Sequence, residues 1–333
     1  MYFALTCLRG ILYYPDISKG WKPIGLEAGS ELLQHEDIDA MISHSPPVTG
    51  HMIASELKDR YAIPWIADFP DLWSGNHCYS YGPLRKRIDR RLERKTLSKA
   101  DALVTTSQPW AEKLKVLHSQ KPVHVITHGF DPAEVNRPPA QLVAKFTITY
   151  TGIIYAGKQD PAKLFIALRD LISEGTMKQD QIEVRFYGSN LEWWDKDIKK
   201  YGLSNVVTQR ERVPKEVALQ RQRESQLLLL LDWDDPKEMG VYPSKIFEYL
   251  GARRPILATG GYSGNVVGEL LNETKAGRHA PTIEDIRKTL KELYREYELG
   301  GQVAYEGDEA AIEKYSHREM AGKFAEILDR LAS

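Results

Sequence analysis

The chain alternates short apolar runs with helix-length segments, and this alternation limits its possible folds more than any other feature. Leu227–Leu231 is a run of five leucines, which is typical of a strand buried on both faces of a parallel sheet. Strands that alternate with helices predict βαβ units and therefore an α/β protein. The expected strands form two series: 39–45, 63–69, 100–107 and 123–129, then 146–152, 182–188, 206–213, 227–233, 254–260 and 276–281.

The two series of strands predict two Rossmann-like domains. The segment 131–144 contains three prolines and has no clear period, so it is the best candidate for the linker. We therefore expect one domain over residues 1–140 and a second over 145–315. In open parallel sheets, ligands bind beyond the carboxyl ends of the strands, so the loops that follow the strands are where functional residues are expected.

Composition excludes several classes of function. The 333 residues include 45 basic and 46 acidic side chains, which does not favour nucleic acid as a partner. Cys7 and Cys78 match no metal spacing and indicate thiols in a reducing compartment. Without a membrane-length apolar run or a signal peptide pattern, we expect a cytoplasmic protein. The histidines also lack metal-ligand spacing, so no bound metal is expected: His44, His51, His77 and His128.

The segment GVYPSKIFEYLGARRPILATGG, residues 240–261, leads from a Gly/Pro turn into a helix and then a strand. Pro243 suits the first helical position, and the N–H groups and dipole at a helix N-terminus favour phosphate. Lys245 would assist a diphosphate there, although a cation is unfavourable for the helix itself. Glu248, one turn on, could accept hydrogen bonds from the two vicinal hydroxyls of a ribose. The alternative is a solvated Lys/Glu pair on a surface helix.

A second loop, YTGIIYAGKQDPAK, also leads from the end of a strand into a helix and carries glycines and a lysine. Gly152 and Gly157 allow the backbone to approach a ligand, and Lys158 could neutralise phosphate. The alternative is an exposed loop lysine. Two such strand-end loops in one domain favour a phosphate-bearing ligand over that alternative.

The motifs above resemble a known family. YPSKIFEYLGARRPILATGG is similar to the nucleotide-binding signature of family 4 of the retaining glycosyltransferases, which have the two-Rossmann GT-B fold. In the same order, IPWIADFPDLW, RLERKTLSKADALVTTSQPWAEKL, VHVITHGFD, FTITYTGIIYAGKQDP and LLLLLDW also resemble this family, over nearly all the chain from about Asp39. The resemblance implies two domains facing a cleft, a C-terminal helix (about 316–332) that returns to the first domain, and neither metal nor other cofactor.

The resemblance also implies roles for individual residues in the second domain. Glu248 would hold the donor ribose, Lys158 the donor diphosphate, and Gly152 would open the phosphate-side loop. Backbone N–H groups near the phosphate and sugar would come from the turn that comprises Tyr242, Pro243, Ser244 and Lys245, in which Pro243 has no N–H of its own.

Further roles concern the nucleobase and the acceptor. Asp68 and His44 stand at strand ends of the first domain, on the acceptor side, and Asp68 is the first choice for the catalytic base. The border of the nucleobase site would be formed by Gly188, Arg212, Val213 and Pro214.

The implied activity is transfer of a hexose from a nucleotide diphosphate-sugar to an acceptor hydroxyl, with retention of configuration. The acceptor would be a glycan or a lipid-linked molecule in the synthesis of a cell-surface polysaccharide or glycolipid. Two alternatives stay open: a nucleotide-sugar epimerase on the same fold, and a non-catalytic or truncated sugar-nucleotide binder.

The chain departs from the family pattern at several positions. Gly240 stands where a second glutamate is usual, Ile153 where an arginine often accompanies the lysine, and Pro70 interrupts a motif that otherwise reads DFRDLW. The opening ILYYPDISKGWKP has no glycine-rich loop before it. We therefore expect an amino-terminally truncated first domain with a sheet of about four strands, and impaired transfer activity.

A basic helix is expected over residues 84–99. Within RKRIDRRLERK, only Asp89 and Glu93 oppose the arginines and lysines, and Leu84, Ile88 and Leu92 recur at helical spacing. The plainer interpretation is a solvated helix packed on its sheet. The alternative is peripheral contact with an anionic membrane.

Overall fold

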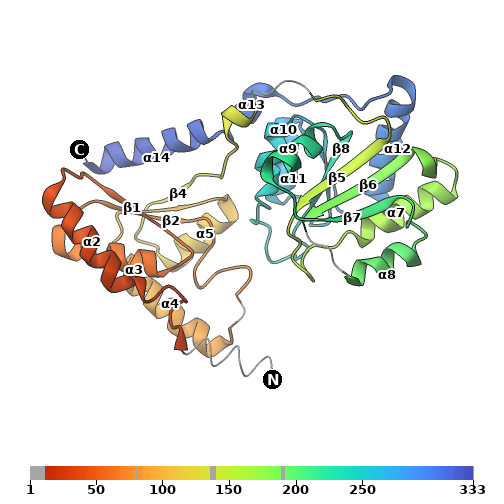
Figure 1. The fold of residues 1–333 in the computed structure, drawn as a ribbon. Coiled ribbons are helices and arrows are strands. Elements are labelled where there is room, and N and C mark those ends of the chain that lie inside the picture. Colours follow the sequence, from red (N-terminus) through yellow and green to blue (C-terminus); the bar gives the residue numbers. More distant parts are fainter. Residues whose placement is uncertain (1–11, 80, 136–139, 189–191, 333) are drawn as a thin grey trace. The chain divides into compact units, whose positions relative to one another are not determined.

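The computed structural model describes residues 12–79, 81–135, 140–188 and 192–332 (Figure 1). Two compact units emerge: unit 1 comprises Met1–His128 with Met320–Ser333, and unit 2 comprises Gly129–Glu319. Each unit is built on a parallel sheet, and a strand lies in each of the ten predicted segments. The α/β prediction is therefore confirmed.

The sheet of unit 1 keeps its strands in chain order, β1-β2-β3-β4. All neighbours are parallel, and His44 pairs with Asp68 in the register of the first two strands. The expected sheet of about four strands is thus present. The strands are β1 (Met41–His44), β2 (Trp65–Phe69), β3 (Ala102–Thr105) and β4 (Val123–Val125).

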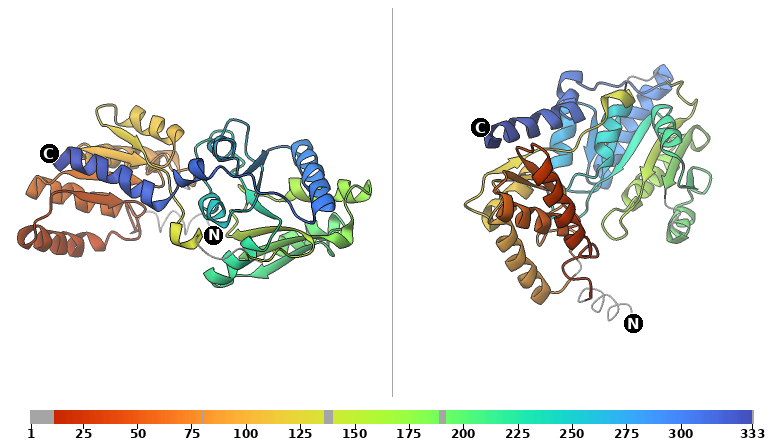
Figure 2. Two further views of the ribbon diagram at one scale, coloured as in Figure 1. Left: turned by 90° about the horizontal axis from the view of Figure 1, so that it is seen from above. Right: turned by 60° about the vertical axis from the view of Figure 1, so that its left-hand side comes forward.

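Helices cover both faces of this sheet. Right-handed crossovers between consecutive neighbouring strands place their helices on one face. The opposite face packs against the C-terminal helix α14, whose Ile327 joins Ile66 and Val104 in one hydrophobic cluster. Figures 1 and 2 show α14 on one side of the sheet with α3 and α4 on the other. The bounds are α3 (Thr49–Tyr61), α4 (Pro83–Leu97), α5 (Gln108–Leu117) and α14 (His317–Ala332).

Helix α2 (Trp21–His35) lies against α3 through two glycines. A Cβ atom at Gly25 would lie 2.7 Å from Ile53 Cδ1, and one at Gly29 would lie 2.6 Å from Leu57 Cδ1. The small residues therefore allow the two helices to approach closely. Leu26 is the one buried residue of the helix.

The sheet of unit 2 has the order β10-β9-β8-β5-β6-β7, and all neighbours are parallel. The chain starts in the middle at β5, builds outward to β7, and returns to build the other half from β8. The strands are β5 (Phe146–Gly152), β6 (Ile182–Gly188), β7 (Val207–Glu211), β8 (Leu227–Leu231), β9 (Ile256–Thr259) and β10 (Gly277–Ala280).

Two hydrophobic cores flank this sheet. Leu227, Leu229 and Leu231 belong to one core, and Leu228 and Leu230 to the other, as expected for a strand buried on both faces. No helix in the described ranges is both long and apolar enough to cross a membrane. The remaining helices are α6 (Pro132–Val135), α7 (Ala162–Ser173), the 3₁₀ turn η1 (Gln179–Gln181), α8 (Glu192–Lys200), α9 (Lys215–Arg223), α10 (Lys245–Ala252), α11 (Val266–Thr274), α12 (Ile283–Gly300) and α13 (Glu309–Glu313).

The boundary between the units falls earlier than residue 140, because Phe130 belongs to unit 2. Its N–H donates to the carbonyl of Tyr315 (3.0 Å), and its carbonyl accepts from His317 N (2.9 Å). Its ring is buried in the core that contains α10. The segment that follows β4 is thus fixed to the second unit before the proline-rich stretch begins.

Candidate functional site

The topology of unit 2 directs attention to the loops beyond the ends of β5 and β8. The strand order reverses between these two neighbours, and such a switch point is where open parallel sheets bind ligands. The loop after β5 carries Lys158, and the loop after β8 leads to α10. Both predicted phosphate loops therefore meet at one place in the sheet.

Two glycines open the ends of β5 and β6. Gly152 and Gly188 pair in register and have φ angles of +141° and +134°, which other residues rarely adopt. A Cβ at Gly188 would lie 2.1 Å from the carbonyl oxygen of Gly152. A Cβ at Gly152 would lie 3.3 Å from Lys245 Cε, so the Lys245 side chain passes directly over this strand end.

Helix α10 presents the predicted lysine and glutamate on one face. Lys245 Nζ donates to both carboxylate oxygens of Glu248, at 3.0 and 2.9 Å, and their side chains are 31% and 21% exposed. Pro243 accepts from Ile246 N at 2.9 Å. Ser244 is the N-cap, without a side-chain hydrogen bond, and Tyr242 is partly buried against Phe247.

Gln222 on α9 fixes the position of Glu248. This side chain is fully buried. Its Nε2 donates to Thr151 Oγ1 (2.8 Å) and to Glu248 Oε1, while Thr151 N donates to the Tyr249 hydroxyl (2.9 Å). The carboxylate of Glu248 is therefore tied to β5 through a buried amide. The sequence interpretation missed Gln222, because no local motif distinguishes it from the polar residues around it.

Lys158 is held by an acidic partner from the loop after β8. Its Nζ donates to Asp235 Oδ2 at 2.7 Å and lies 5.9 Å from the centre of the Trp233 ring. The backbone supports the pair, because Asp234 N donates to the Lys158 carbonyl at 2.9 Å. The hydrogen bond from Lys158 holds the pKa of the Asp235 carboxyl below its usual range. Each of the two predicted phosphate lysines thus has a carboxylate partner in the same unit.

A buried polar cluster supports the ends of β8, β9 and β10. Asp232 accepts from Trp233 N (2.7 Å) and Asn265 Nδ2 (2.6 Å) and lies 3.2 Å from His279 Nε2. Burial alone would lower the pKa of His279, but the hydrogen bond and charge of Asp232 outweigh it and raise the pKa. A Cβ at Gly261 would lie 2.4 Å from Asp232 Oδ2. This cluster positions the Gly-Gly turn, and the sequence analysis did not identify it.

Two residues of the predicted nucleobase border, Arg212 and Val213, line a cleft beside α9, whereas Gly188 and Pro214 are not part of its lining. Pro214 is the N-cap of that helix, and residues 189–191 of the adjoining loop lie outside the described residues. The cleft measures about 550 Å³ and is lined by Arg185, Tyr187, Arg210, Glu211, Arg212, Val213, Val217 and Arg221.

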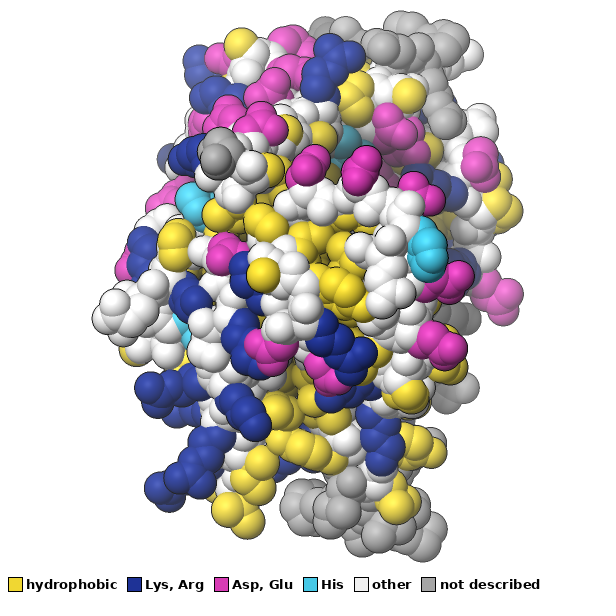
Figure 3. All heavy atoms as spheres, turned by 90° about the vertical axis from the view of Figure 1, so that its left-hand side faces the viewer, with side chains coloured by type: hydrophobic (Ala, Val, Ile, Leu, Met, Phe, Trp, Pro, Cys, Tyr) yellow, Lys and Arg dark blue, Asp and Glu magenta, His cyan; other side chains and the backbone are white. Residues whose placement is uncertain are grey.

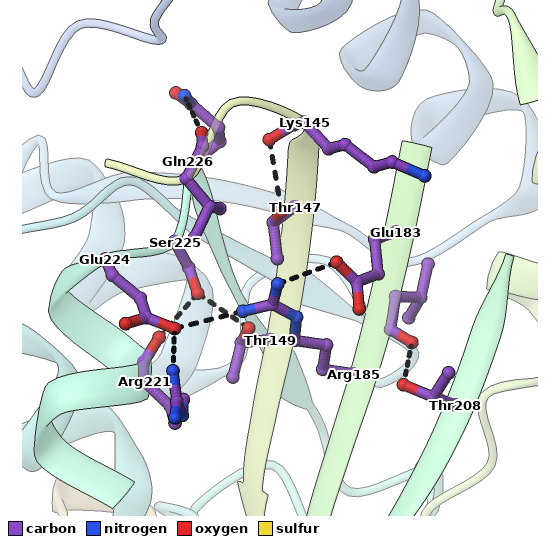
Figure 4. A network of polar contacts seen from close by, with 12 residues as sticks. Lys145, Thr147, Thr149, Glu183, Arg185, Thr208, Arg221, Glu224, Ser225 and Gln226 are labelled. Carbon is purple, nitrogen blue, oxygen red and sulfur yellow. Dashed lines mark hydrogen bonds and ion pairs between the residues drawn. The ribbon is translucent and has the colours of Figure 1, made fainter. Parts of the chain in front are cut away.

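Arg185 is fixed at the floor of this cleft by two carboxylates. Its guanidinium donates to Glu183 (2.7 Å) and Glu224 (3.0 Å), and Arg221 donates to the same Glu224 at 2.7 Å. Figure 4 shows these side chains converging between β6 and α9. The hydrogen bond and the charge of Arg185 hold the pKa of Glu183 below its usual range. The polar floor of the cleft is therefore held in place by ion pairs within unit 2.

The two acceptor-side residues of unit 1 lie together. His44 Nδ1 and Asp68 Oδ2 are 2.8 Å apart, with side chains 60% and 14% exposed. The hydrogen bond to Asp68 raises the pKa of His44. The structure therefore forms one exposed carboxylate–imidazole pair at the ends of β1 and β2.

This architecture is similar to that of known proteins. Residues 13–129 match the family described as glycosyl transferase 4-like domain. No curated protein sequence matches the chain.

Several solved structures share the fold at low sequence identity. Sucrose-phosphate synthase from Thermosynechococcus elongatus has a TM-score of 0.68 and 11% identity, over 94% of this chain and 79% of that one. HepE from Anabaena, solved with UDP and glucose, has a TM-score of 0.68 and 13% identity, over 93% and 82%. A TarM variant from S. aureus, solved with Fondaparinux, alpha-GlcNAc-glycerol and UDP, has a TM-score of 0.63 and 11% identity, over 91% and 58%.

These matches support a sugar-transferase function in general terms. Residues 13–129 match a glycosyl transferase 4-like domain, and the chain as a whole shares the GT-B fold of the solved glycosyltransferases.

Proposed function

We propose that the chain is a retaining glycosyltransferase that moves a hexose from a nucleotide diphosphate-sugar to a hydroxyl of a glycan or lipid-linked acceptor. One observation carries the proposal: Lys158, Lys245 and the start of α10 lie in the loops that follow β5 and β8, beside the glycines that end β5 and β6. Cations, a helix N-terminus and open backbone together suit a diphosphate.

The ion pairs of the free protein indicate how a donor would bind. A diphosphate would attract Lys245 away from Glu248 and Lys158 away from Asp235. Both lysines are about one-third exposed, so part of each side chain is accessible to a ligand. Glu248, still fixed by Gln222, would then accept hydrogen bonds from the ribose hydroxyls. Exchange of partners would thus couple diphosphate binding to ribose binding.

In the transfer step, the bond between the anomeric carbon and the diphosphate oxygen breaks, and its electron pair stays on the diphosphate. Lys158, Lys245 and the N–H groups of α10 would stabilise that negative charge. We assign no metal to this step, because the lysines supply the positive charge.

We assign the acceptor side to unit 1. The acceptor hydroxyl loses its proton as its oxygen attacks the anomeric carbon. Asp68 is the proposed base, and His44 would orient its carboxylate through the hydrogen bond between them. A carboxylate and an imidazole in contact can share one proton, which suits a group that accepts a proton and later releases it.

Complexes of similar folds are consistent with these ligands. HepE has been solved with UDP, with UDP and glucose, and with UDP-glucose. The TarM variant was solved with UDP and with glycan molecules. Those ligands belong to those proteins, and they suggest UDP-sugars as the first donors to test.

The test combines binding and turnover on one preparation. UDP, GDP and their sugars are screened by thermal shift, and the best donor is then assayed for transfer, hydrolysis and epimerisation. A bound nucleotide raises the melting temperature by mass action, and Glu248→Ala should remove most of that rise. Glu284→Ala, an exposed glutamate of α12, is the matched control.

Each result decides between the functions. Transfer of the sugar to an acceptor supports the proposal, and an epimerised donor replaces it with the epimerase. Binding without any reaction leaves a sugar-nucleotide binder. Equal thermal shifts in the parent and Glu248→Ala proteins would contradict the ribose assignment.

A further inference from the structure

Helix α4 in unit 1 turns both of its acids inward. Asp89 is buried and accepts from Arg85 Nε at 2.9 Å and from the Tyr79 hydroxyl at 2.6 Å. Glu93 is also buried and accepts from Ser74 N at 3.0 Å. These carboxylates anchor the preceding loop, so they do not offset charge on the outer face of the helix.

The charged side chains on the outer face of α4 are therefore all cations. The acids of the neighbouring helix α3 are engaged elsewhere, since Asp59 pairs with Lys99 and Glu56 with both Lys22 and Arg60. Five exposed cations on α4 make no ion pair with any described residue: Arg87, Arg90, Arg91, Arg94 and Lys95.

Apolar side chains are exposed at the N-terminal end of the same helix. Leu84 is 74% exposed, Ile88 46% and Tyr81 39%. Leu84 and Ile88 are one helical turn apart, and Arg91 and Lys95 continue the same stripe. Figure 3 shows Lys and Arg side chains gathered at the lower left of this face of the molecule, beside hydrophobic side chains along its lower edge.

We propose that this face of α4 docks on the surface of an anionic lipid bilayer. The five cations would meet lipid phosphates, and Leu84 and Ile88 would enter the boundary between headgroups and acyl chains. A helix with a cationic face and exposed aliphatic side chains binds such surfaces in the interface plane. Nucleic acid also attracts cations, but it offers no apolar layer for Leu84 and Ile88. The proposal does not depend on sugar transfer.

The experiment uses the full chain and sedimentation with vesicles. Equal parts of phosphatidylglycerol and phosphatidylcholine form the anionic vesicles, and phosphatidylcholine alone forms the neutral ones. Each cation near an anionic surface strengthens binding roughly fivefold, so Arg91→Gln with Lys95→Gln should weaken it on the order of 25-fold. Lys291→Gln with Arg295→Gln removes the same charges from an exposed turn of α12 and should change little.

A second variant tests the apolar part. Leu84→Gln with Ile88→Gln should reduce the binding that remains at about 0.5 M salt, where charge attraction is largely screened. Leu299→Gln, a leucine that is 81% exposed on α12, is its control.

Three results would overturn the proposal. The first is equal binding to the anionic and the neutral vesicles, and the second is an equal loss of vesicle binding in the charge variant and its α12 control. The third is displacement of the protein from anionic vesicles by a DNA duplex, together with unchanged vesicle binding of Leu84→Gln with Ile88→Gln. Circular dichroism on every variant confirms that its helices are intact.

Discussion

The two sheets use the same βαβ unit, but they order their strands differently. In unit 1 the strand order is β1-β2-β3-β4 without reversal, and α14 covers the sheet face opposite the crossover helices. Unit 2 reverses between β5 and β8, so helices cover both faces and two loops diverge at the strand ends. Crevices form at such reversals. This difference is the reason why we propose the diphosphate site in unit 2, whereas the proposed acceptor side of unit 1 rests on the pair of His44 and Asp68 at the ends of β1 and β2.

The units also differ in how their cations are used. At the switch point of unit 2, Lys158 and Lys245 each contact a carboxylate. On α4 of unit 1, five cations face solvent while the acids of that helix are buried. Paired lysines on open strand ends can exchange their partners for a bound anion. Unpaired cations on an outer face attract a large anionic surface instead.

The largest expected effect concerns the strand-end glycines that open the switch point. Gly188→Ala would place a methyl group 2.1 Å from the Gly152 carbonyl oxygen at a φ of +134°. We expect a loss of about 3 kcal/mol or more in the free energy of unfolding of unit 2, because clash and backbone strain add. Denaturant unfolding measures it.

The matched control for that change is Gly322→Ala on α14, where a Cβ meets no atom within 4 Å. It should be neutral or slightly stabilising, since alanine favours a helix by up to about 1 kcal/mol. If the two variants unfolded alike, the strand ends would not need their glycines.

The next largest effect concerns nucleotide affinity. Lys158→Ala and Lys245→Ala should each weaken diphosphate binding about tenfold or more, since a charge-assisted contact contributes roughly 1.5–3 kcal/mol. Nucleosides without phosphate should lose much less. Titration calorimetry with UDP and uridine measures both affinities, and Lys288→Ala, an exposed lysine of α12, is the control. Equal losses for UDP and uridine would show that these lysines are not phosphate ligands.

Much of the fold was predictable from sequence because buried parallel strands appear as apolar runs. Leu227–Leu231 is the clearest case, as each leucine faces one of two cores. The start of α10 was predictable to within two residues. The helix begins at Lys245 with Ser244 as its N-cap, so Pro243 precedes the helix and does not occupy its first position as predicted. Local rules therefore locate strands, helix starts and the loops between them.

The partners of the charged residues were not predictable. Gln222 and Glu248 are brought together only when α9 and α10 pack on the sheet, and Asp235 meets Lys158 across the switch point. Asp89 and Glu93 appear in the sequence as acids that dilute a basic helix, yet burial removes them from its outer face. Such pairings depend on tertiary packing, which no short motif encodes.

A smaller effect on nucleotide affinity is expected when the carboxylate partner of Lys158 is removed. Asp235→Asn removes the charge that holds Lys158 in the free protein, while the amide oxygen can still accept from Lys237 N. UDP affinity should rise by up to about fivefold, because an exposed ion pair stabilises by no more than about 1 kcal/mol. Asp180→Asn, an exposed aspartate of η1, should leave the affinity unchanged. A fall in UDP affinity would mean that Asp235 positions Lys158 for phosphate and does not compete with it.

The smallest expected effect is the pH dependence of the exposed pair in unit 1. Asp68 raises the pKa of His44, so the folded protein holds this proton more tightly than the unfolded chain. The stabilisation is fully present below about pH 6.5, the ordinary pKa of histidine, and is lost as the pH rises through the raised value. Because His44 is largely exposed, its contribution to the free energy of unfolding should not exceed about 1 kcal/mol.

The free energy of unfolding of His44→Gln should therefore fall short of the parent's at about pH 6 and approach it at about pH 9. A constant difference between parent and His44→Gln across this range would mean that the imidazole and Asp68 do not share a charge in the folded protein, and His44 would then lose its proposed role in orienting the base.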